Sequence, residues 1–380
     1  MFKRKRKASP ESSDEFNPFA QPQKPKRFKA WVRDHKKLFI LLIAVGVILL
    51  AGAGVGAYYL LNQKPAEVAQ VPEPTPEPEP EPVHYYSPLT GNEVKTEATT
   101  KQAVTAVMIE NSPDARPQSG LKQAGVVFEA IAEGGITRFL VLYQEQKPAL
   151  IGPVRSVRMY YVDWVAAFDA SVAHVGGSAK ALKELRNGKY RDIDQFFNSA
   201  SYWRATDRYA PHNVYTNFTR LDALNARKGY KTSDFTGFTR TDSEPAAKPT
   251  ATKINVKISS ALFNSSYTYD AKTNTYKRSQ AGQPHKDRED GQIQPRVVVV
   301  LKVTESTVFE DGYRESINAI GKGKAVIFQN GTAKEVNWQK KSRAGQLTFT
   351  DAEGKDVPLA RGQTWITAVP QNKGGNVTWQ

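Results

Sequence analysis

The stretch at residues 126–143 reads VVFEAIAEGGITRFLVLY, and IGPVRSVR follows at residues 151–158. Two apolar runs, each typical of a β-strand, meet at Gly134-Gly135, a pair of residues that permits a sharp turn or a close approach of the backbone. The stretch therefore predicts two buried strands joined by a tight connection.

Charged residues lie inside these apolar runs or at their ends, namely Glu129, Glu133, Arg138, Arg155 and Arg158. Ionised side chains are seldom buried unless they are paired, so these charges need partners. Two interpretations follow. In the first, the two carboxylates pair with the three guanidinium groups and bind nothing else. In the second, the charges line a pocket at the strand ends that holds a polar ligand.

An uncharged apolar segment occupies residues 38–61. As a helix it is about 36 Å long, enough to cross a hydrocarbon core of about 30 Å. Residues 1–37 carry twelve Lys and Arg against four Asp and Glu, whereas residues 62–86 carry one Lys and five Glu. The positive-inside rule therefore predicts a single-pass membrane protein with a cytoplasmic N-terminus and its folded part outside. A cleaved signal peptide is the alternative, although the apolar run exceeds a normal signal sequence.

The segments that flank the apolar run are polar. Residues 1–37 predict a disordered basic tail. Residues 62–86 predict a stalk, since residues 63–82 are rich in Pro and Glu and predict an extended polyproline-II segment that reaches on the order of 60 Å. Within the apolar run, Gly52 and Gly56 form a GxxxG pair, which either packs two helices into a homodimer or is merely tolerated by lipid.

Composition excludes several classes of function. The chain has no cysteine, which excludes disulfides, thiol nucleophiles and thiolate metal ligands. The net charge is +15, of which +11 is spread over residues 87–380. We expect no nucleic-acid partner, because no dense basic stripe with interleaved aromatic residues stands out there. An anionic wall polymer or anionic lipid headgroups are more consistent with this charge.

Residues 87–240 have a mixed pattern. Strands are predicted at residues 103–110 and 170–175, and helical spacing appears at residues 159–168. Ser178 and Thr219 are predicted to cap helices over residues 178–186 and 219–228, and Ser119 to cap a short helix through residue 124.

A predicted linker at residues 239–252 separates this half from a second half of different character. Predicted strands there are residues 253–260, 265–270, 275–279, 296–304, 324–329, 346–351 and 363–369. Asn330-Gly331 is a strong hairpin signal. We therefore expect an α+β fold with a mixed α/β N-terminal half, residues 87–240, and a mostly β C-terminal half, residues 253–380.

Several longer motifs occur in a fixed order. They are residues 109–121, 129–138 and 151–158, then HVGGS at 174–178, APHN at 210–213, PHKD at 284–287, QNG at 329–331 and GQTWI at 362–366. Over residues 85–370 the chain resembles the YerB-like family of bacterial envelope proteins. The resemblance implies an extracytoplasmic two-part domain of unknown function and implies no reaction. The chain departs from the family's common lipoprotein form, since it has an apolar helix and no cysteine to carry a lipid.

The arginines favour recognition of an anion, because guanidinium groups fork onto carboxylates and phosphates. The predicted ligand-binding residues are Glu110, Asn111, Arg116, Glu133, Arg138, Arg155, Arg158, Asp163, His174, His212 and Asn213. We expect a membrane-anchored domain that binds a wall glycopeptide or wall polymer without a cofactor. We expect no metal site either, because His174, His212 and His285 lack ligand spacing to one another.

Two alternatives remain open. The first is a cell-wall glycan hydrolase that uses Glu133 with Glu129 or Glu110 as its acid and base, with His174 as a weaker catalytic candidate. On a regular strand Glu129 and Glu133 face the same side, roughly 13 Å apart at the backbone, so Glu110 on a neighbouring strand is the other possible partner. The second alternative is a protein-interaction platform whose β-rich half docks an envelope enzyme.

Overall fold

The computed structural model describes residues 28–63, 83–308 and 314–380. The first 27 residues of the predicted tail and residues 64–82 of the predicted stalk lie outside the described residues. The chain divides into two compact units, Met1–Pro80 and Glu81–Gln380.

In the first unit, helix α1 (Phe28–Asp34) precedes helix α2 (Lys36–Leu61). Within the described ranges, α2 is the one helix long and apolar enough to cross a membrane, and it contains the predicted span. The prediction of disorder is wrong for residues 28–37, most of which are helical. Rings one helical turn apart, those of Trp31 and His35, stack with centroids 5.3 Å apart and favour this helix.

The second unit is built around a large sheet, in which twelve strands are described. Ten of them follow the order β22-β21-β20-β17-β24-β4-β5-β3-β6-β7. Their bounds are β3 (Thr105–Glu110), β4 (Val126–Glu133), β5 (Ile136–Tyr143), β6 (Ser171–Ala173), β7 (Arg191–Asp192), β17 (Val297–Val303), β20 (Gly321–Gln329), β21 (Thr332–Lys340), β22 (Thr348–Thr350) and β24 (Thr364–Pro370). Two further strands, β18 (Glu305–Val308) and β19 (Arg314–Ile317), lie off this path.

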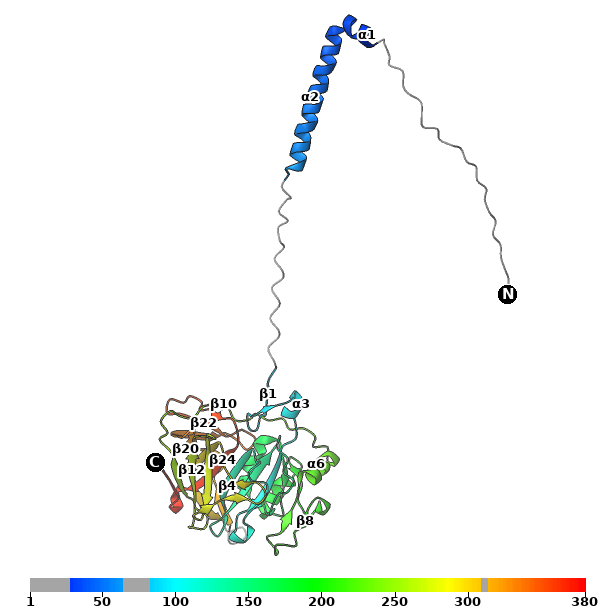
Figure 1. Ribbon diagram of the computed structural model, residues 1–380. Helices are drawn as coiled ribbons and strands as arrows, with labels where there is room; N and C mark the ends of the chain where they lie inside the picture. The colour runs from blue at the N-terminus through cyan, green and yellow to red at the C-terminus, as the bar shows by residue number, and fades with distance from the viewer. Residues whose placement is uncertain (1–27, 64–82, 309–313) are drawn as a thin grey trace, which may run out of the picture. The chain divides into compact units, whose positions relative to one another are not determined.

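The two halves of the sequence meet inside this sheet. Strand β24 of the C-terminal half pairs in parallel with β4 of the N-terminal half, with Thr364 opposite Val126 and Thr367 opposite Glu129. Figure 1 labels β20, β24 and β4 within this sheet, in which β24 is next to β4 and β17 lies between β20 and β24. The predicted two-part division is thus a division of the sequence, whereas the sheet and its cores are shared.

The hairpin predicted at residues 126–143 is confirmed. Strands β4 and β5 pair antiparallel, and both glycines of the connection have positive φ, 57° at Gly134 and 77° at Gly135. Both strands are almost entirely buried. Because other elements cover both faces of the sheet, the strands read as continuous apolar runs and not as an alternation.

A β-bulge near the end of β4 changes which way its last side chain points. Ile131 lies opposite Thr137, but Glu133 lies opposite Ile136, so Ala132 is an extra residue on β4. The bulge moves Glu133 to the sheet face opposite that of Glu129. The prediction that the two glutamates face the same side is therefore wrong.

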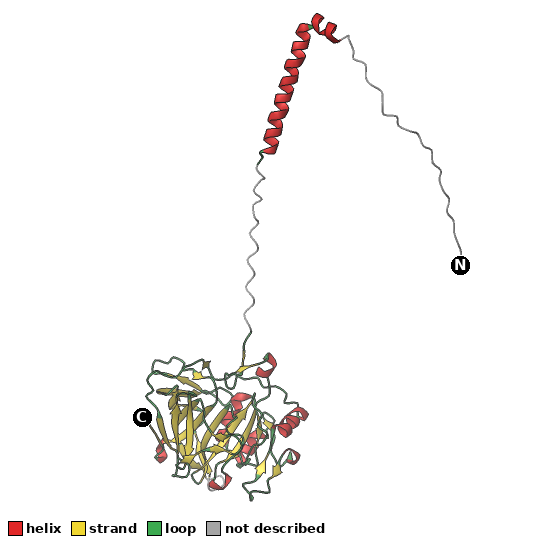
Figure 2. Cartoon of the chain, in the orientation of Figure 1, coloured by secondary structure: helices red, strands yellow, loops and turns green. Residues whose placement is uncertain are grey.

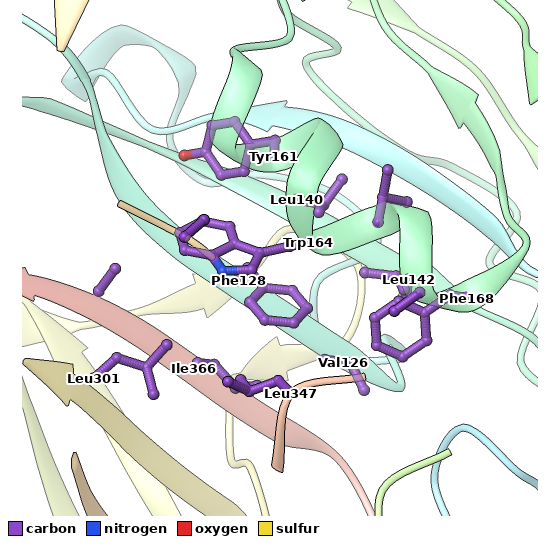
Figure 3. Close-up of a cluster of buried hydrophobic side chains, with 14 of the residues drawn as sticks. Val126, Phe128, Leu140, Leu142, Tyr161, Trp164, Phe168, Leu301, Leu347 and Ile366 are labelled. Atoms are coloured by element: carbon purple, nitrogen blue, oxygen red, sulfur yellow. The ribbon is translucent and has the colours of Figure 1, made fainter. Parts of the chain in front are cut away.

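Helices cover one face of the sheet. Helix α4 (Met159–Val165) and helix α5 (Ala179–Leu185) contribute to a core that includes even-numbered residues of β4 and β5. Figure 3 shows Trp164 of α4 against Phe128 of β4, with ring centroids 5.2 Å apart. The predicted cap of α5 is confirmed, since Ser178 Oγ accepts a hydrogen bond from the amide of Ala181.

A second, five-stranded sheet contributes to the core on the opposite face of the large sheet, together with helix α6 (Phe218–Arg227). Its order is β14-β13-β12-β11-β25. The bounds are β11 (Lys253–Lys257), β12 (Ser265–Asp270), β13 (Thr275–Gln280), β14 (Gln283–Pro284) and β25 (Asn376–Trp379). In Figure 2 the strands dominate the unit and most of its helices lie toward one side. The expected α+β fold is confirmed.

Two local predictions fail. Helix α6 begins after Asn217, whose Oδ1 accepts from the amide of Arg220 at 3.0 Å, so Thr219 is inside the helix and not its cap. Ser119 caps no helix, because its backbone exchanges hydrogen bonds with Gly152. In both places a side-chain or backbone contact that is not visible in local propensity determines the structure.

Candidate functional site

Glu129 lies at the joint between the two halves and is fully buried. Its Oε2 is 2.8 Å from Nη2 of Arg278, which is equally buried on β13. The same oxygen accepts from Nε1 of Trp365 at 3.0 Å. Two buried charges in contact satisfy one another, so Glu129 is closed to solvent and to any substrate.

The buried ion pair continues into a chain of hydrogen bonds. Arg278 Nη1 contacts Nδ1 of His285, and Nε2 of His285 contacts Oε1 of Gln118 at 3.0 Å. Burial, followed by the charges of Arg278 and Arg116, lowers the pKa of His285 well below its ordinary value. A neutral His285 accepts from Arg278 and donates to Gln118, and this arrangement links the second sheet to the loop after β3.

Asn111 and Arg116 belong to the same closed network. Asn111 Nδ2 donates to Oγ1 of Thr137 at 2.6 Å, and its Oδ1 accepts from Arg116 Nε at 3.2 Å. Arg116 also donates to the backbone carbonyl of Leu262 at 2.9 Å. These two predicted ligand-binding residues therefore pack the halves together.

Glu133 forms a second cluster on the helical face. Arg158 donates from Nη2 to Oε1 at 2.6 Å and from Nε to Oε2 at 3.1 Å, and Arg138 Nη2 lies 3.2 Å from Oε1. Burial alone would raise the pKa of Glu133, but the charges and hydrogen bonds of the two arginines outweigh it and lower the pKa. The side chain of Glu133 is 32% exposed, and the two arginines keep it in the ionised carboxylate form.

Glu110 forms a third cluster, on the loop side of β3. Its Oε1 lies 3.0 Å from Nδ1 of His212 and 3.4 Å from Nε of Arg155, and it accepts from Oγ of Ser112 at 2.9 Å. Oε2 of Glu110 is buried and has no hydrogen-bond partner among the described residues. Glu110 thus orients the imidazole of His212 through Nδ1, and Nε2 is the ring nitrogen that remains for other contacts.

An open cavity of about 590 Å³ adjoins this third cluster. We call it the seam cavity, because both halves of the sequence supply its walls. It is lined by Asp114, Asp207, Arg208, Tyr209, His212 and Arg288. His212 is thus the one predicted site residue that lines the seam cavity.

Two arginines of the seam cavity differ in their partners. Arg288 Nη2 is 2.6 Å from Oδ2 of Asp207, which neutralises its charge. Arg208 donates to two backbone carbonyls, of Asp114 at 3.1 Å and of Pro117 at 2.6 Å, and forms no ion pair among the described residues, although its charge acts on the adjacent Asp207. Carbonyl groups fix the guanidinium in place without cancelling its charge, so Arg208 is an oriented cation beside an open cavity.

His174 lies apart from all three clusters and is completely buried. Its Nε2 contacts Oδ1 of Asp192 at 2.9 Å, and its Nδ1 contacts the carbonyl of Gly176 at 2.7 Å. Both ring nitrogens are therefore occupied within the fold. His174 shapes the loops around it and has no free nitrogen for catalysis.

The two remaining predicted residues are also bound within the fold. Asp163 Oδ1 is 2.7 Å from Nε of Arg343, and Asn213 Oδ1 accepts from Arg204 Nη1 at 2.8 Å. Among the described residues no group of three or more His, Cys, Asp or Glu side chains is arranged to hold a metal ion. The predicted site residues thus form separate clusters and not one pocket.

The residues that sequence reasoning missed are of two kinds. Arg278 stands at an inward position of the alternating segment 275–280, between buried Tyr276 and Gln280, and this pattern could have revealed a buried charge. Arg208 and Tyr209 lie in an irregular loop where nothing in the local pattern distinguishes them from other exposed residues.

Fold and site define the class of protein: an α+β domain made of two sequence segments, which share one sheet and are joined by a buried ion pair. Comparison with known families gives the same division. Residues 89–231 match the N-terminal domain of a protein family of unknown function, DUF3048, and residues 254–366 match its C-terminal domain. The chain belongs to this family.

Two findings connect the chain to YerB of Bacillus subtilis. A protein of strain 168 named "Putative lipoprotein YerB" is 35% identical over 289 residues, which are 75% of this chain and 86% of that protein. The crystal structure of YerB protein from Bacillus subtilis superimposes with a TM-score of 0.69 at 32% identity, covering 77% of this chain and 99% of that one. The predicted resemblance to the YerB-like family is confirmed.

Proposed function

We propose that this chain is a membrane-anchored protein of the cell envelope whose folded unit, outside the cytoplasm, binds a polar anionic wall glycopeptide or wall polymer in the seam cavity. The anchor is helix α2, which is long and apolar enough to span a bilayer. The name of the Bacillus subtilis relative, a lipoprotein, is consistent with attachment to a membrane by another means.

The observation that carries the proposal is Arg208. Its guanidinium lines the seam cavity, is fixed by two carbonyl groups, and forms no ion pair with a carboxylate among the described residues. A fixed guanidinium that is not itself ion-paired favours an anionic group in the cavity, since hydrogen bonds to charged partners are about twice as strong as neutral ones. A wall peptide carboxylate and a polymer phosphate both supply such a group.

Two neighbours of Arg208 add contacts for the rest of such a ligand. His212 lines the cavity, and its Nε2 lies 3.9 Å from Oδ2 of Asp114, too far for a hydrogen bond, so this nitrogen is available to a ligand. Tyr209 is 90% exposed and offers a flat aromatic face beside these polar groups. A ligand with an anionic group, hydroxyl or amide groups and an apolar ring face fits this set.

The glycan-hydrolase alternative lacks comparable support. Glu129 is sealed against Arg278, and Glu133 is held ionised by Arg138 and Arg158 on the opposite face of the sheet. A general acid needs a raised pKa and access to the bond that it protonates. Glu110, the third candidate, is only 4% exposed and contacts His212 and Arg155, so it too lacks access. None of the three glutamates meets both conditions.

The binding proposal is tested on the folded unit, residues 83–380, which is compact and corresponds to the crystallised chain of the relative. Calorimetric titration uses two probes, soluble disaccharide-peptides from digested wall and purified wall teichoic acid. We expect saturable binding of one probe and at least a tenfold loss of affinity in Arg208→Ala. Arg227→Ala, an exposed arginine with no partner among the described residues, is the control that retains binding. Absence of binding to both probes, or equal affinity in Arg208→Ala, would overturn the proposal.

Membrane placement is tested separately on the full chain in cells. Alkaline phosphatase fused after residue 380 is expected to be active, and the same enzyme fused before residue 1 to be inactive. The opposite result would overturn the proposed orientation. Crosslinking decides between the two alternatives for Gly52 and Gly56: crosslinked dimers that Gly52→Ile, Gly56→Ile abolishes support a homodimer, and their absence in the wild type supports mere tolerance by lipid.

A further inference from the structure

Two consecutive phenylalanines stand out on the described surface of the folded unit. Phe196 is 68% exposed and Phe197 is 71% exposed, on the turn that follows β7. Single exposed apolar residues are ordinary, but adjacent large aromatic side chains in solvent are a feature of interaction surfaces.

The turn that presents these rings is held rigidly from below. Asp194 is fully buried, and its Oδ1 accepts from the backbone amides of Gly176 at 3.1 Å and Phe196 at 3.2 Å. The carbonyl of Asp194 accepts from the side chain of Asn198 at 2.8 Å. A surface that is already ordered loses little conformational entropy when it binds, so this network prepares the two rings for contact.

Helix α5 and its C-terminal end carry three basic side chains, and the last of them contacts the aromatic pair. Lys180, Lys183 and Arg186 follow one another at intervals of three along α5 and its C-terminal end, so neighbouring members lie one turn apart. The guanidinium of Arg186 lies 4.9 Å from the ring centroid of Phe197 and is ion-paired with Asp194, with 2.7 Å between Nη2 and Oδ2, so the two lysines carry the free positive charge. Both lysines are exposed, and neither has an acidic partner among the described residues.

We infer that this face, composed of Phe196, Phe197, Lys180, Lys183 and Arg186, docks the folded unit onto an anionic lipid surface. Protein interfaces are enriched in aromatic residues and arginine but depleted in lysine, whereas lysines near a bilayer are attracted to anionic headgroups. The two unpaired lysines therefore favour lipid over a protein partner.

The inference rests on the proposed membrane anchor in one respect only: in the cell, the anchor keeps the folded unit within reach of a bilayer. A tether that keeps the unit near a bilayer raises the effective concentration of lipid, so a weak docking face suffices. The phenylalanine rings enter the boundary between headgroups and acyl chains, and the lysines remain at the headgroups.

Vesicle co-sedimentation of residues 83–380 tests the inference. The vesicles are phosphatidylcholine alone or phosphatidylcholine mixed with phosphatidylglycerol. We expect binding to the mixed vesicles that weakens with salt, and at least a fivefold loss of affinity in Phe196→Ser, Phe197→Ser. Lys180→Glu, Lys183→Glu is expected to bind as weakly. Because the fragment lacks α2 and the assay contains no wall ligand, failure of the proposed anchor or of the seam cavity would not alter this result.

Matched controls distinguish specific binding through the docking face from non-specific hydrophobic binding and from an effect of net charge. Leu262→Ser removes an exposed apolar side chain elsewhere, and Lys272→Glu, Lys355→Glu changes the net charge by the same amount at other exposed positions. Both controls are expected to bind like the wild type, and thermal unfolding confirms that each variant is folded. Equal binding to both vesicle types, no binding by the wild type, or unchanged binding in the phenylalanine variant would overturn the inference.

Discussion

The carboxylate of Glu129 on β4 and the guanidinium of Arg278 on β13 form an ion pair of 2.8 Å with neither side chain exposed. One residue comes from each half of the sequence, and the indole of Trp365 on the strand beside β4 lies 4.5 Å under the same guanidinium. A charge this deeply buried is tolerated only with its partner in place, so correct folding of one half depends on the other.

This dependence predicts a large loss of stability when one partner is removed. Glu129→Gln or Arg278→Met is expected to destabilise the folded unit by about 3–5 kcal/mol, because each leaves an unpaired buried charge. The double variant Glu129→Gln, Arg278→Met is expected to lose less than the sum of the two. Urea unfolding of residues 83–380 measures these differences.

The control for this cycle is a pair on the surface. Glu97 and Lys101 are 2.6 Å apart but highly exposed, and Glu97→Gln is expected to leave the urea midpoint almost unchanged. Additive effects at Glu129 and Arg278, or effects as small as that of Glu97→Gln, would show that the buried pair does not join the halves.

The cluster around Glu133 predicts sensitivity to acid. Its pKa is lowered in the folded protein below the ordinary value of 4.5, so the carboxylate stabilises the fold above that pH. That contribution is lost as the pH falls from 4.5 through the folded-state pKa. Glu133→Gln is expected to remove this part of the pH dependence in thermal unfolding between pH 3 and 6, whereas Glu335→Gln, an exposed control, retains it.

Glu305 predicts a pH dependence of the opposite sign. Burial, and then the nearby charge of Glu315, raises the pKa of Glu305 to about 7. The folded protein therefore holds a proton that the unfolded chain releases near 4.5, so this contribution to stability is lost as the pH rises from 4.5 through 7. Glu305→Gln is expected to stabilise the folded unit by roughly 1–3 kcal/mol at pH 8 and not at pH 4.

A second variant checks the stated cause. Glu315→Gln removes the neighbouring charge that raises the pKa of Glu305, so it is expected to reduce the same slope without abolishing it. If Glu305→Gln changes stability equally at pH 4 and pH 8, its carboxyl group does not titrate as described.

Local signals in the sequence predicted much of the fold. The β4–β5 hairpin follows from two apolar runs around Gly134-Gly135, and the start of α5 follows from Ser178. The pairing of β24 with β4 joins residues more than 230 positions apart, and no local pattern specifies it. The sequence likewise contains no signal for the β-bulge at Ala132, yet this bulge determines the sheet face on which Glu133 lies.

For the site, the sequence predicted the charged residue types and not their grouping. Charges inside apolar strands require partners, and that argument is sound for Glu129, whose main partner, Arg278, is supplied by the distant β13. Only tertiary structure shows that Arg208 and Arg288 line one cavity with His212. A side chain's position in an irregular loop has no periodicity from which it could be predicted.

The central claim, that the seam cavity holds an anionic envelope ligand, is tested most directly by a crystal structure of residues 83–380. The crystals are grown with whichever probe binds in the titration. We predict density for the ligand in the seam cavity, with its carboxylate or phosphate in hydrogen-bond contact with Arg208 and another polar group at Nε2 of His212. Ligand density elsewhere on the molecule, or an empty seam cavity at a saturating ligand concentration, would contradict the account.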